Sequence, residues 1–318
     1  MSAVSPADVA TEIDTPRTAI TWATSVLQAA GVPTPAVDAA LLAAHSAGLS
    51  RSEFEKALLL GSDIWTAEVC NQFADLVTQR AQRVPLQHLT GKGAFRYLEL
   101  AVGPGVFIPR PETEVVAQQG IDFALELPQP ALLVDLCTGS GAIAISLLTE
   151  VPGAQVYAVE LDRAAHAWAA KNVVANPNAH GEVVQLVRGD ARTALPQLNG
   201  TVDAVISNPP YVPPGHIPRE VEVCIHDPQV ALYGLGDDGL EVPRGITLAA
   251  ARLLRPGGLY VMEHAEVQAL GAREMVDATG YFEPAQTILD LTGRDRMVVA
   301  RRNTRPFEAG SVLEGQPL

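Results

Sequence analysis

Residues 132–141 read Leu-Leu-Val-Asp-Leu-Cys-Thr-Gly-Ser-Gly, and this stretch is the most informative about the fold. An apolar run leads directly into a loop with glycines at 139 and 141, and a helical pattern begins near Ala142. Glycine lets a backbone pass close to a ligand, and open α/β sheets bind ligands at the carboxyl ends of their strands. We therefore expect a strand, a ligand-binding loop and a helix, in that order.

Further apolar runs follow at helix-length intervals, separated by amphipathic stretches. They occupy residues 156–159, 183–187, 204–206 and 259–262. Near-continuous apolar runs are typical of strands in a parallel sheet that is covered on both faces. Two last runs, 286–289 and 297–300, flank Gly293 and predict a closing antiparallel pair. The predicted fold class is α/β, with a doubly wound sheet.

The region before the sheet has a different pattern. Residues 15–85 contain four helical segments, the first starting with Thr15 as N-cap and Pro16 at the first helical position, and they predict a small helical domain. Glycines and prolines separate short β-prone pieces at 86–107, which predicts a β-hairpin linker. The α/β domain takes residues 108–302, and the polar ends, 1–14 and 303–318, are predicted to be disordered.

The composition excludes several classes of protein. The 318 residues include 22 basic and 36 acidic side chains, a net charge of −14 without any dense basic run, so we expect no direct binding of nucleic acid. The 3 cysteines and 7 histidines show no spacing of a disulfide framework or a metal site. No signal peptide or bilayer-spanning stretch is recognisable. We expect a cytoplasmic monomer without a metal ion.

Three strand ends supply candidate cofactor ligands. The first loop contributes Asp135, Cys137, Thr138, Gly139, Ser140 and Gly141. Glu160 ends the next strand, where its carboxylate can accept hydrogen bonds from both hydroxyls of a ribose. Asp190 follows the third strand and can accept a hydrogen bond from an adenine amino group, while Ala191 offers apolar contact. The loop also fits the looser dinucleotide pattern GxGxxA, so by itself it does not distinguish a nicotinamide dinucleotide from S-adenosylmethionine.

The motif Asn208-Pro209-Pro210-Tyr211, directly after the run at 204–207, separates these cofactors. Two prolines fix φ and remove two backbone donors, so the loop is rigid and rich in acceptors. The Asn208 side-chain oxygen and the Pro209 carbonyl can each accept one proton of a planar amino group, beside the flat wall of Tyr211. A dinucleotide enzyme has no evident use for this cleft. The motif predicts methyl transfer to an amino group, with adenine, cytosine and glutamine all open as acceptors.

With these motifs the chain closely resembles the release-factor glutamine methyltransferases, the HemK-like family that methylates a glutamine side-chain amide. The resemblance extends from about residue 15 to residue 301. Besides the motif at 208–211, it rests on Pro-Leu-Gln-His-Leu-Thr-Gly at 85–91, on Phe-Ile-Pro-Arg-Pro-Glu-Thr-Glu at 107–114, and on Ala231-Leu232 with Gly-Asp-Asp-Gly-Leu at 236–240. The string at 109–114 distinguishes this family from the DNA adenine methyltransferases.

The resemblance implies a seven-stranded class I methyltransferase sheet joined by a hairpin to a helical N-terminal domain. It implies methyl transfer from S-adenosylmethionine, with S-adenosylhomocysteine as product, to the glutamine of a GGQ-type motif in peptide chain release factors. Residues 208–211 are then catalytic and substrate-binding, Asn208 is also cofactor-binding, and Phe107 and Tyr211 flank the glutamine. Arg110 lies on the substrate side, where we expect it to support the hairpin and loop rather than take part chemically.

Two departures from the family pattern concern the cofactor side. Many relatives have a glycine and an aromatic residue where this chain has Cys137 and Ala191. On the substrate side, Asp227-Pro228 replaces a Glu-Pro that is common in relatives. Glu263 and His264, after the run at 259–262, stand at a strand end from which they could touch the site, but we expect them to form a hydrogen-bonded structural pair.

Two other functions remain open at this point. A nucleic-acid amino-methyltransferase acting on the exocyclic amine of adenine or cytosine would use the same cleft. It predicts a basic groove and a target-recognition insertion, and the sequence shows neither. A binding module without turnover would need only the fold, but the chain has Asn208, Glu160 and the glycine loop.

Overall fold

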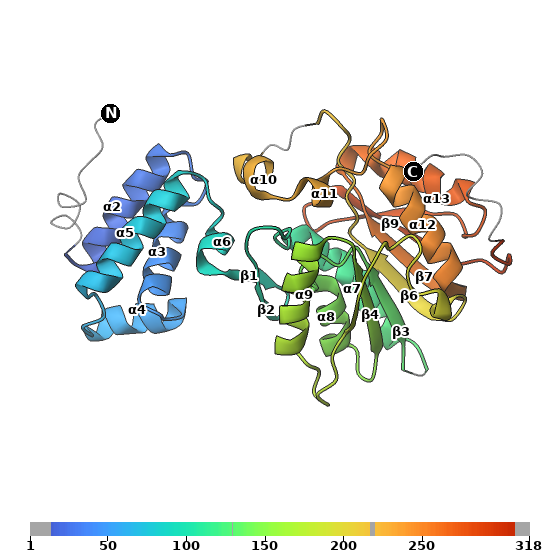
Figure 1. The fold of residues 1–318 in the computed structure, drawn as a ribbon, viewed down its shortest axis with the longest axis horizontal. Coiled ribbons are helices and arrows are strands. Elements are labelled where there is room, and N and C mark those ends of the chain that lie inside the picture. Colours follow the sequence, from blue (N-terminus) through green and yellow to red (C-terminus); the bar gives the residue numbers. More distant parts are fainter. Residues whose placement is uncertain (1–13, 129, 217–219, 309–318) are drawn as a thin grey trace. The chain divides into compact units, whose positions relative to one another are not determined.

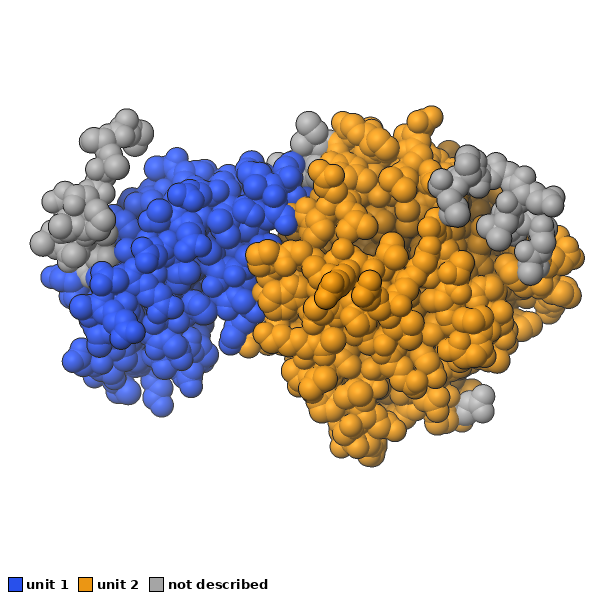
Figure 2. Space-filling view, in the orientation of Figure 1, with its two compact units in different colours: residues 1–92, 218–226 blue, residues 93–217, 227–318 orange. Residues whose placement is uncertain are grey.

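The computed structural model of the protein describes residues 14–128, 130–216 and 220–308. The chain forms two compact units, drawn in Figures 1 and 2. Unit 1 comprises residues 1–92 and 218–226, and unit 2 comprises residues 93–217 and 227–318. The chain therefore leaves unit 2 after residue 217 and returns to it at residue 227.

Unit 1 is helical, as the sequence predicts. Its helices are α2 (Pro16–Ala29), α3 (Pro35–Ser46), α4 (Arg51–Leu60), α5 (Ala67–Ala81), α6 (Leu86–Thr90) and α10 (Val221–His226). Thr15 and Ser50 accept hydrogen bonds from the first turns of α2 and α4, which satisfies donors that have no partner within the helix. Leu27, Leu42 and Phe73 are fully buried in the shared core.

The predicted β-hairpin linker is shorter than expected. Residues 86–90 form α6, which Pro85 precedes and Gly91 ends with a left-handed φ of 71°. The hairpin itself consists of β1 (Lys92–Phe95) and β2 (Leu98–Ala101). The sequence interpretation was wrong for 86–90 because the glycine at 91, taken as a sign of β-turns, terminates a helix here.

Unit 2 contains a seven-stranded sheet. Its strands are β3 (Leu132–Leu136), β4 (Gln155–Glu160), β5 (Gln185–Arg188), β6 (Val202–Ser207), β7 (Leu254–Glu263), β8 (Gln286–Leu289) and β9 (Asp295–Arg301). They lie in the order β5-β4-β3-β6-β7-β9-β8. The first five are parallel, and β9 is antiparallel to both β7 and β8. This confirms the predicted α/β fold class and the closing antiparallel pair.

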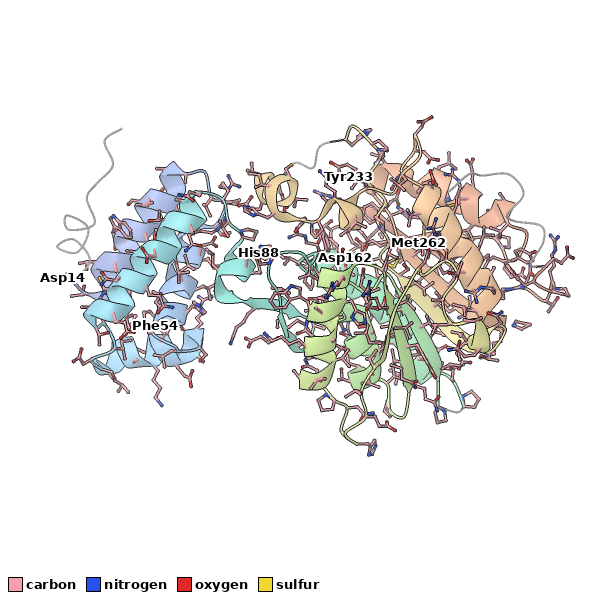
Figure 3. The ribbon with its side chains drawn as sticks, viewed as in Figure 1. Asp14, Phe54, His88, Asp162, Tyr233 and Met262 are labelled. Carbon is pink, nitrogen blue, oxygen red and sulfur yellow. The ribbon has the colours of Figure 1, made fainter. Side chains whose placement is uncertain are left out.

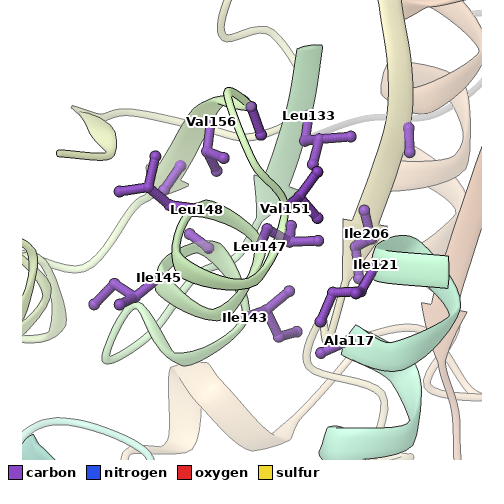
Figure 4. Close-up of a cluster of buried hydrophobic side chains, with 14 of the residues drawn as sticks. Ala117, Ile121, Leu133, Ile143, Ile145, Leu147, Leu148, Val151, Val156 and Ile206 are labelled. Atoms are coloured by element: carbon purple, nitrogen blue, oxygen red, sulfur yellow. The ribbon is translucent and has the colours of Figure 1, made fainter. Parts of the chain in front are cut away.

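Helices cover both faces of this sheet. The longer ones are α7 (Pro111–Leu125), α8 (Ala142–Glu150), α9 (Arg163–Ala175), α12 (Glu241–Leu253) and α13 (Ala269–Ala278), and the short ones are α11 (Gln229–Leu232), η1 (Pro196–Leu198) and η2 (Glu266–Gln268). Side chains of α7, α8 and α9 share one buried cluster with alternate strand residues, part of which Figure 4 shows around Ile143, Leu147 and Ile206. Residues of α12 and α13 share the other cluster with the intervening strand residues, such as Val134 and Val205. Two faces covered by separate helices make a doubly wound sheet.

Part of the predicted C-terminal tail packs on unit 2. The Asn303 side chain donates hydrogen bonds to the carbonyls of Gly280 and Phe282, and the Phe307 ring lies 5.1 Å from that of Tyr281. The prediction of disorder was therefore wrong for residues 303–308, because two side chains provide local contacts that polar composition does not reveal. Residues 1–13 and 309–318 lie outside the described residues. Among those described, no helix is both long and apolar enough to cross a bilayer.

Candidate active site

A cavity of about 600 Å³ opens in unit 2 where β3, β4, β5 and β6 end, a volume typical of small-molecule sites. The residues predicted for the site that line it are Phe107, Cys137, Thr138, Gly139, Ser140, Glu160, Asp190, Ala191, Asn208, Pro210 and Tyr211. Of the predicted residues, all of them described, Asp135, Gly141, Pro209 and Arg110 lie outside the lining. Asp162 and Tyr233, which the sequence did not single out, also line the cavity and are labelled in Figure 3.

The loop after β3 has a left-handed backbone. The φ angles of Cys137, Gly139 and Gly141 are 64°, 58° and 88°. Behind the loop, the fully buried Asp135 carboxylate accepts hydrogen bonds from the Thr138 hydroxyl and the Ala144 backbone N–H. Burial raises the pKa of Asp135 to about 7, against the opposing effect of these hydrogen bonds. Asp135 therefore holds the loop to the start of α8 from behind.

Glu160 ends β4 and faces the cavity with little exposure. Its Oε2 accepts a hydrogen bond from the Gly139 backbone N–H and its Oε1 from that of Asp162, each at 2.8 Å. Burial raises the pKa of this carboxyl group, and the backbone N–H groups partly oppose the shift. Each oxygen has a second acceptor position, so the carboxylate can still accept from a pair of vicinal hydroxyls.

Asp190 forms an ion pair that the sequence did not reveal. Arg192 donates to it from Nε and Nη2, with the shortest N–O distance at 2.6 Å. These hydrogen bonds lower the pKa of Asp190, although partial burial acts in the other direction. A ligand amino group at Asp190 would have to share the carboxylate oxygens with Arg192.

The loop at 208–211 is held by the end of α11 and by the segment that follows it. The backbone N–H groups of Tyr211 and Val212 donate to the Leu232 carbonyl at 3.1 and 2.8 Å. A Cβ atom added at Gly234 would lie 1.8 Å from the Gly239 carbonyl oxygen, so these glycines approach more closely than any other residue could. The family motif at 231–240 therefore packs against the motif at 208–211.

Two family models match the chain: "PrmC N-terminal domain" over residues 18–91 and "Methyltransferase small domain" over residues 119–226. A release factor glutamine methyltransferase from Mycolicibacterium smegmatis is 46% identical over 91% of this chain and 98% of the relative. One from Bifidobacterium longum is 44% identical over 88% of this chain and 97% of the relative. The chain belongs to the release factor glutamine methyltransferase family.

A further relative carries a different name. The 4-amino-L-phenylalanine/4-methylamino-L-phenylalanine methyltransferase of Streptomyces pristinaespiralis is 37% identical over 90% of this chain and 94% of that relative. The relatives of this chain are therefore named for more than one kind of methyl acceptor.

A hydrogen-bond network connects Asn208 to Thr113, which also lines the cavity, and to Glu263. The Asn208 Nδ2 group donates to the Thr113 hydroxyl at 3.1 Å, and this hydroxyl donates to Glu263 Oε2 at 2.7 Å. The Tyr211 hydroxyl donates to Glu263 Oε1 at 2.9 Å. Burial raises the pKa of Glu263, against the hydrogen bonds from Thr113 and Tyr211.

Sequence reasoning did not single out Thr113, and it gave Glu263 only as a strand-end residue that could touch the site. Glu263 was expected to pair with His264, but the His264 ring hydrogen-bonds to the Ala265 carbonyl through Nδ1, so that expectation was wrong. The strand-end position was the signal for Glu263: it ends β7, the neighbour of β6, just as Glu160 ends β4 beside β3. An acidic residue at the carboxyl end of the next strand was a candidate for the same reason.

Arg110 lies beside the cavity rather than on it. Its Nη2 donates to Asp227 Oδ2 at 2.8 Å, and its guanidinium lies 5.0 Å from the centre of the Phe107 ring. The Asp227 side chain is only 1% exposed, so this ion pair is partly desolvated. Arg110 thus connects the segment that carries Phe107 to the start of the 227–235 segment, whose residues line the cavity.

Proposed function

We propose that this protein transfers a methyl group from S-adenosylmethionine to the side-chain amide nitrogen of a glutamine, in a GGQ-type motif of a peptide chain release factor. One observation carries the proposal: the Glu160 carboxylate and the acceptor-rich loop of Asn208 line the same cavity. The first suits the ribose of the methyl donor and the second suits an amide NH2 group. Membership of the family supports the choice of glutamine over a nucleobase.

The residues on the donor side fit S-adenosylmethionine. Glu160 would accept from the ribose hydroxyls, the loop at 137–140 would contact the methionine part, and Asp190 with Ala191 would contact the adenine. When bound, the donor supplies a methyl group that its sulfonium makes electrophilic. Burial raises the pKa of Cys137, so its sulfur stays a neutral thiol and a poor competitor for that methyl group.

On the acceptor side, the protein would position the amide nitrogen for attack and would not need a strong base. An amide nitrogen is a weak nucleophile because its lone pair is delocalised into the carbonyl. Asn208 Oδ1 and the Pro209 carbonyl would each accept one amide proton, which orients the nitrogen and favours the positive charge that develops on it. As the new N–C bond forms, the C–S electron pair stays on sulfur, and one amide proton leaves to water. Phe107 and Tyr211 would enclose the glutamine side chain.

We further infer that the protein acts in the cytoplasm, as a monomer and without direct contact to nucleic acid. The net charge of −14 supports the last of these inferences, because phosphate backbones repel an acidic surface. Release factor is the macromolecular partner in this proposal.

The experiment is incubation of the purified protein with labelled S-adenosylmethionine and a purified release factor. The matched substrate is the same factor with the glutamine of its GGQ motif replaced by alanine. We expect label only on the release factor that keeps its glutamine. We expect Asn208→Ala to reduce kcat at least about 100-fold, because it removes a hydrogen-bond acceptor for the reacting NH2 group.

Three further acceptors complete the design: duplex DNA, ribosomal RNA and free 4-amino-L-phenylalanine. Transfer to any of these with none to the release factor would contradict the proposal. Equal labelling of both release factors would refute the assignment of the glutamine. Unchanged turnover in Asn208→Ala would refute the role of the loop.

A further inference from the structure

We propose that Thr113 and Glu263 are positioning residues that determine which end of the Asn208 carboxamide faces the acceptor. This inference rests on the proposed function, because it concerns how the same reacting nitrogen is held. Neither residue lies in the 208–211 motif, and both act through Asn208 or Tyr211.

The direction of the hydrogen bonds follows from the chemistry of the groups. Burial raises the pKa of Glu263, and the positive charge of Arg296 acts against this effect and so favours the ionised form. An ionised carboxylate only accepts, and Glu263 lies 2.7 Å from the Thr113 hydroxyl and 2.9 Å from that of Tyr211. Burial raises the pKa of the Tyr211 phenol, which therefore keeps its proton to donate. Each hydroxyl has a single proton, so both protons are directed at Glu263.

This leaves the Thr113 oxygen as an acceptor toward Asn208. The carboxamide group that lies 3.1 Å from it must then be the NH2 end, since two acceptors would repel one another. The oxygen end of Asn208 is consequently directed away from Thr113, and Asn208 is a residue of the cavity lining. With the carboxamide reversed, its NH2 group would meet the NH2 group of the substrate, donor against donor.

The network also increases the negative charge on the Asn208 oxygen that would face the substrate nitrogen. Thr113 is 5% exposed and Glu263 is 2% exposed, so water screens their interaction little. A chain of hydrogen bonds that ends on a carboxylate polarises each member, which makes the Asn208 oxygen a stronger acceptor. A stronger acceptor favours the positive charge that develops on nitrogen during methyl transfer.

The decisive variants are Thr113→Val, which removes the hydroxyl at nearly constant shape, and Thr113→Ser, which keeps it. Glu263→Gln replaces one acceptor oxygen by an NH2 group and so cannot accept from both hydroxyls. Thr247→Val is the matched control, because Thr247 is equally buried and bonds to the Pro243 carbonyl and Tyr260 hydroxyl in the core. Residue 247 is outside the cavity lining of the described chain.

We expect Thr113→Val and Glu263→Gln to lower kcat by about 10- to 100-fold, because the reacting groups lose their alignment. Binding of S-adenosylhomocysteine, measured by calorimetry, should change less than about twofold, since the network does not touch the Glu160 side of the cavity. Thr113→Ser should recover most of the turnover. Thr247→Val should alter thermal stability without lowering kcat.

The result that would overturn the inference is a normal kcat in Thr113→Val, or a Thr113→Ser variant as impaired as Thr113→Val. A parallel loss of S-adenosylhomocysteine binding would also overturn it, because it would indicate a general structural role. If the wild-type protein methylates a different acceptor, the same variants are measured on that acceptor. Failure of the proposed function then remains distinguishable from failure of the positioning role.

An observation independent of turnover completes the test. The side-chain NH2 signal of Asn208, assigned by its loss in Asn208→Asp, is followed by proton–nitrogen NMR in the protein with S-adenosylhomocysteine. We expect slow exchange of one of its protons with solvent in the wild type and faster exchange in Thr113→Val. Equal exchange rates in both proteins would contradict the hydrogen bond to Thr113.

Discussion

At the scale of single residues, carboxyl groups of similar burial behave differently because their partners differ. Glu160 has a backbone N–H on each oxygen, while Glu263 has a side-chain hydroxyl on each. Asp135 accepts two hydrogen bonds on Oδ2 alone, and its Oδ1 is buried without a hydrogen-bond partner among the described residues. A buried carboxylate with an unsatisfied oxygen is costly to ionise. The location of these partners therefore distinguishes Glu160, the proposed ribose ligand, from the structural carboxyl group of Asp135.

Glu160→Gln tests the donor side. Glutamine has one NH2 group, which would face one of the two backbone N–H donors and repel it. We expect the dissociation constant of S-adenosylhomocysteine to rise at least about tenfold, a loss of about 1.4 kcal/mol. Calorimetric titration measures it, with Glu283→Gln, an exposed site away from the cavity, as the control. Unchanged affinity in Glu160→Gln would refute its role as a ribose ligand.

Asp135→Asn tests the buried carboxyl group through pH. The folded-state pKa of Asp135 is raised to about 7, above its ordinary value of 3.8, so the folded state binds the proton more tightly than the unfolded state. The stability that this proton provides is present below about pH 4 and is lost as the pH rises through about 7. The neutral asparagine lacks this dependence. We therefore expect the free energy of unfolding of Asp135→Asn minus that of wild type to increase between pH 5 and pH 8. Urea titrations at several pH values measure this difference, and a difference that stays constant would contradict the prediction.

At the scale of elements, the loop at 208–211 depends on the 234–240 segment behind it. Added Cβ atoms would lie 1.8 Å from a backbone oxygen at Gly234 and 2.5 Å from the Tyr211 carbonyl oxygen at Gly239. The Gln268 side chain donates to the carbonyls of Tyr211 and Asp238, each at 2.8 Å, and so links η2 to both segments. These contacts hold the loop at 208–211 against the 234–240 segment and η2.

Gly234→Ala tests this packing. The added methyl group must displace backbone, and we expect a loss of about 2 kcal/mol or more in the free energy of unfolding, together with reduced kcat. Gly189→Ala is the control, because a Cβ atom at Gly189 would meet nothing within 4 Å. Chemical denaturation and turnover measure the pair. Equal effects of the two substitutions would contradict the close packing of the loop.

At the scale of the whole molecule, the chain path makes α10 part of unit 1, although residues on both sides of it line the cavity of unit 2. Within unit 1, Arg80 Nε donates to Asp38 at 2.7 Å, and Arg80 Nη1 donates to Glu222 at 2.9 Å. Arg83 Nη2 lies 2.6 Å from the other Glu222 oxygen. Burial acts to raise the pKa of Glu222, but hydrogen bonds from Arg83 and Arg80 hold it at about 2. This network fastens α10 to the N-terminal helices.

Glu222→Ala tests the attachment of α10. The substitution leaves Arg83 without its carboxylate while Arg80 still has Asp38, so we expect a loss of about 2 kcal/mol in the free energy of unfolding of unit 1. Glu55→Ala is the control, because its ion pair with Arg51 is about 60% exposed and should contribute less than about 0.5 kcal/mol. Since the folded-state pKa of Glu222 is depressed, its contribution should persist above about pH 4.5 and disappear as the pH falls toward 2. Equal stability of the two variants at pH 7 would contradict the network.

Much of this architecture could be predicted from local pattern. The strands at 132–136 and 286–289 begin and end where expected, while β5 starts two residues later than its predicted run and β7 starts five residues earlier. The remaining strands extend their predicted runs by one or two residues at each end. The helix at 86–90 was missed because its glycine signal has two meanings, a turn between strands or the end of a helix. The packed residues 303–308 were missed because two side chains, rather than composition, hold them.

The sequence by itself determined the α/β class, the helical N-terminal segment, and the residues at the strand ends that share one cavity. Strand periodicity, capping residues and glycine placement are local properties, and parallel strands bring their carboxyl ends to one edge. Only the tertiary structure decided that Asn208 meets Thr113 across 95 residues and that Thr113 meets Glu263 across 150. Such contacts depend on how distant elements pack against one another. The motif alone allows either orientation of the Asn208 carboxamide, and the Thr113 hydroxyl with the Glu263 carboxylate selects one of them.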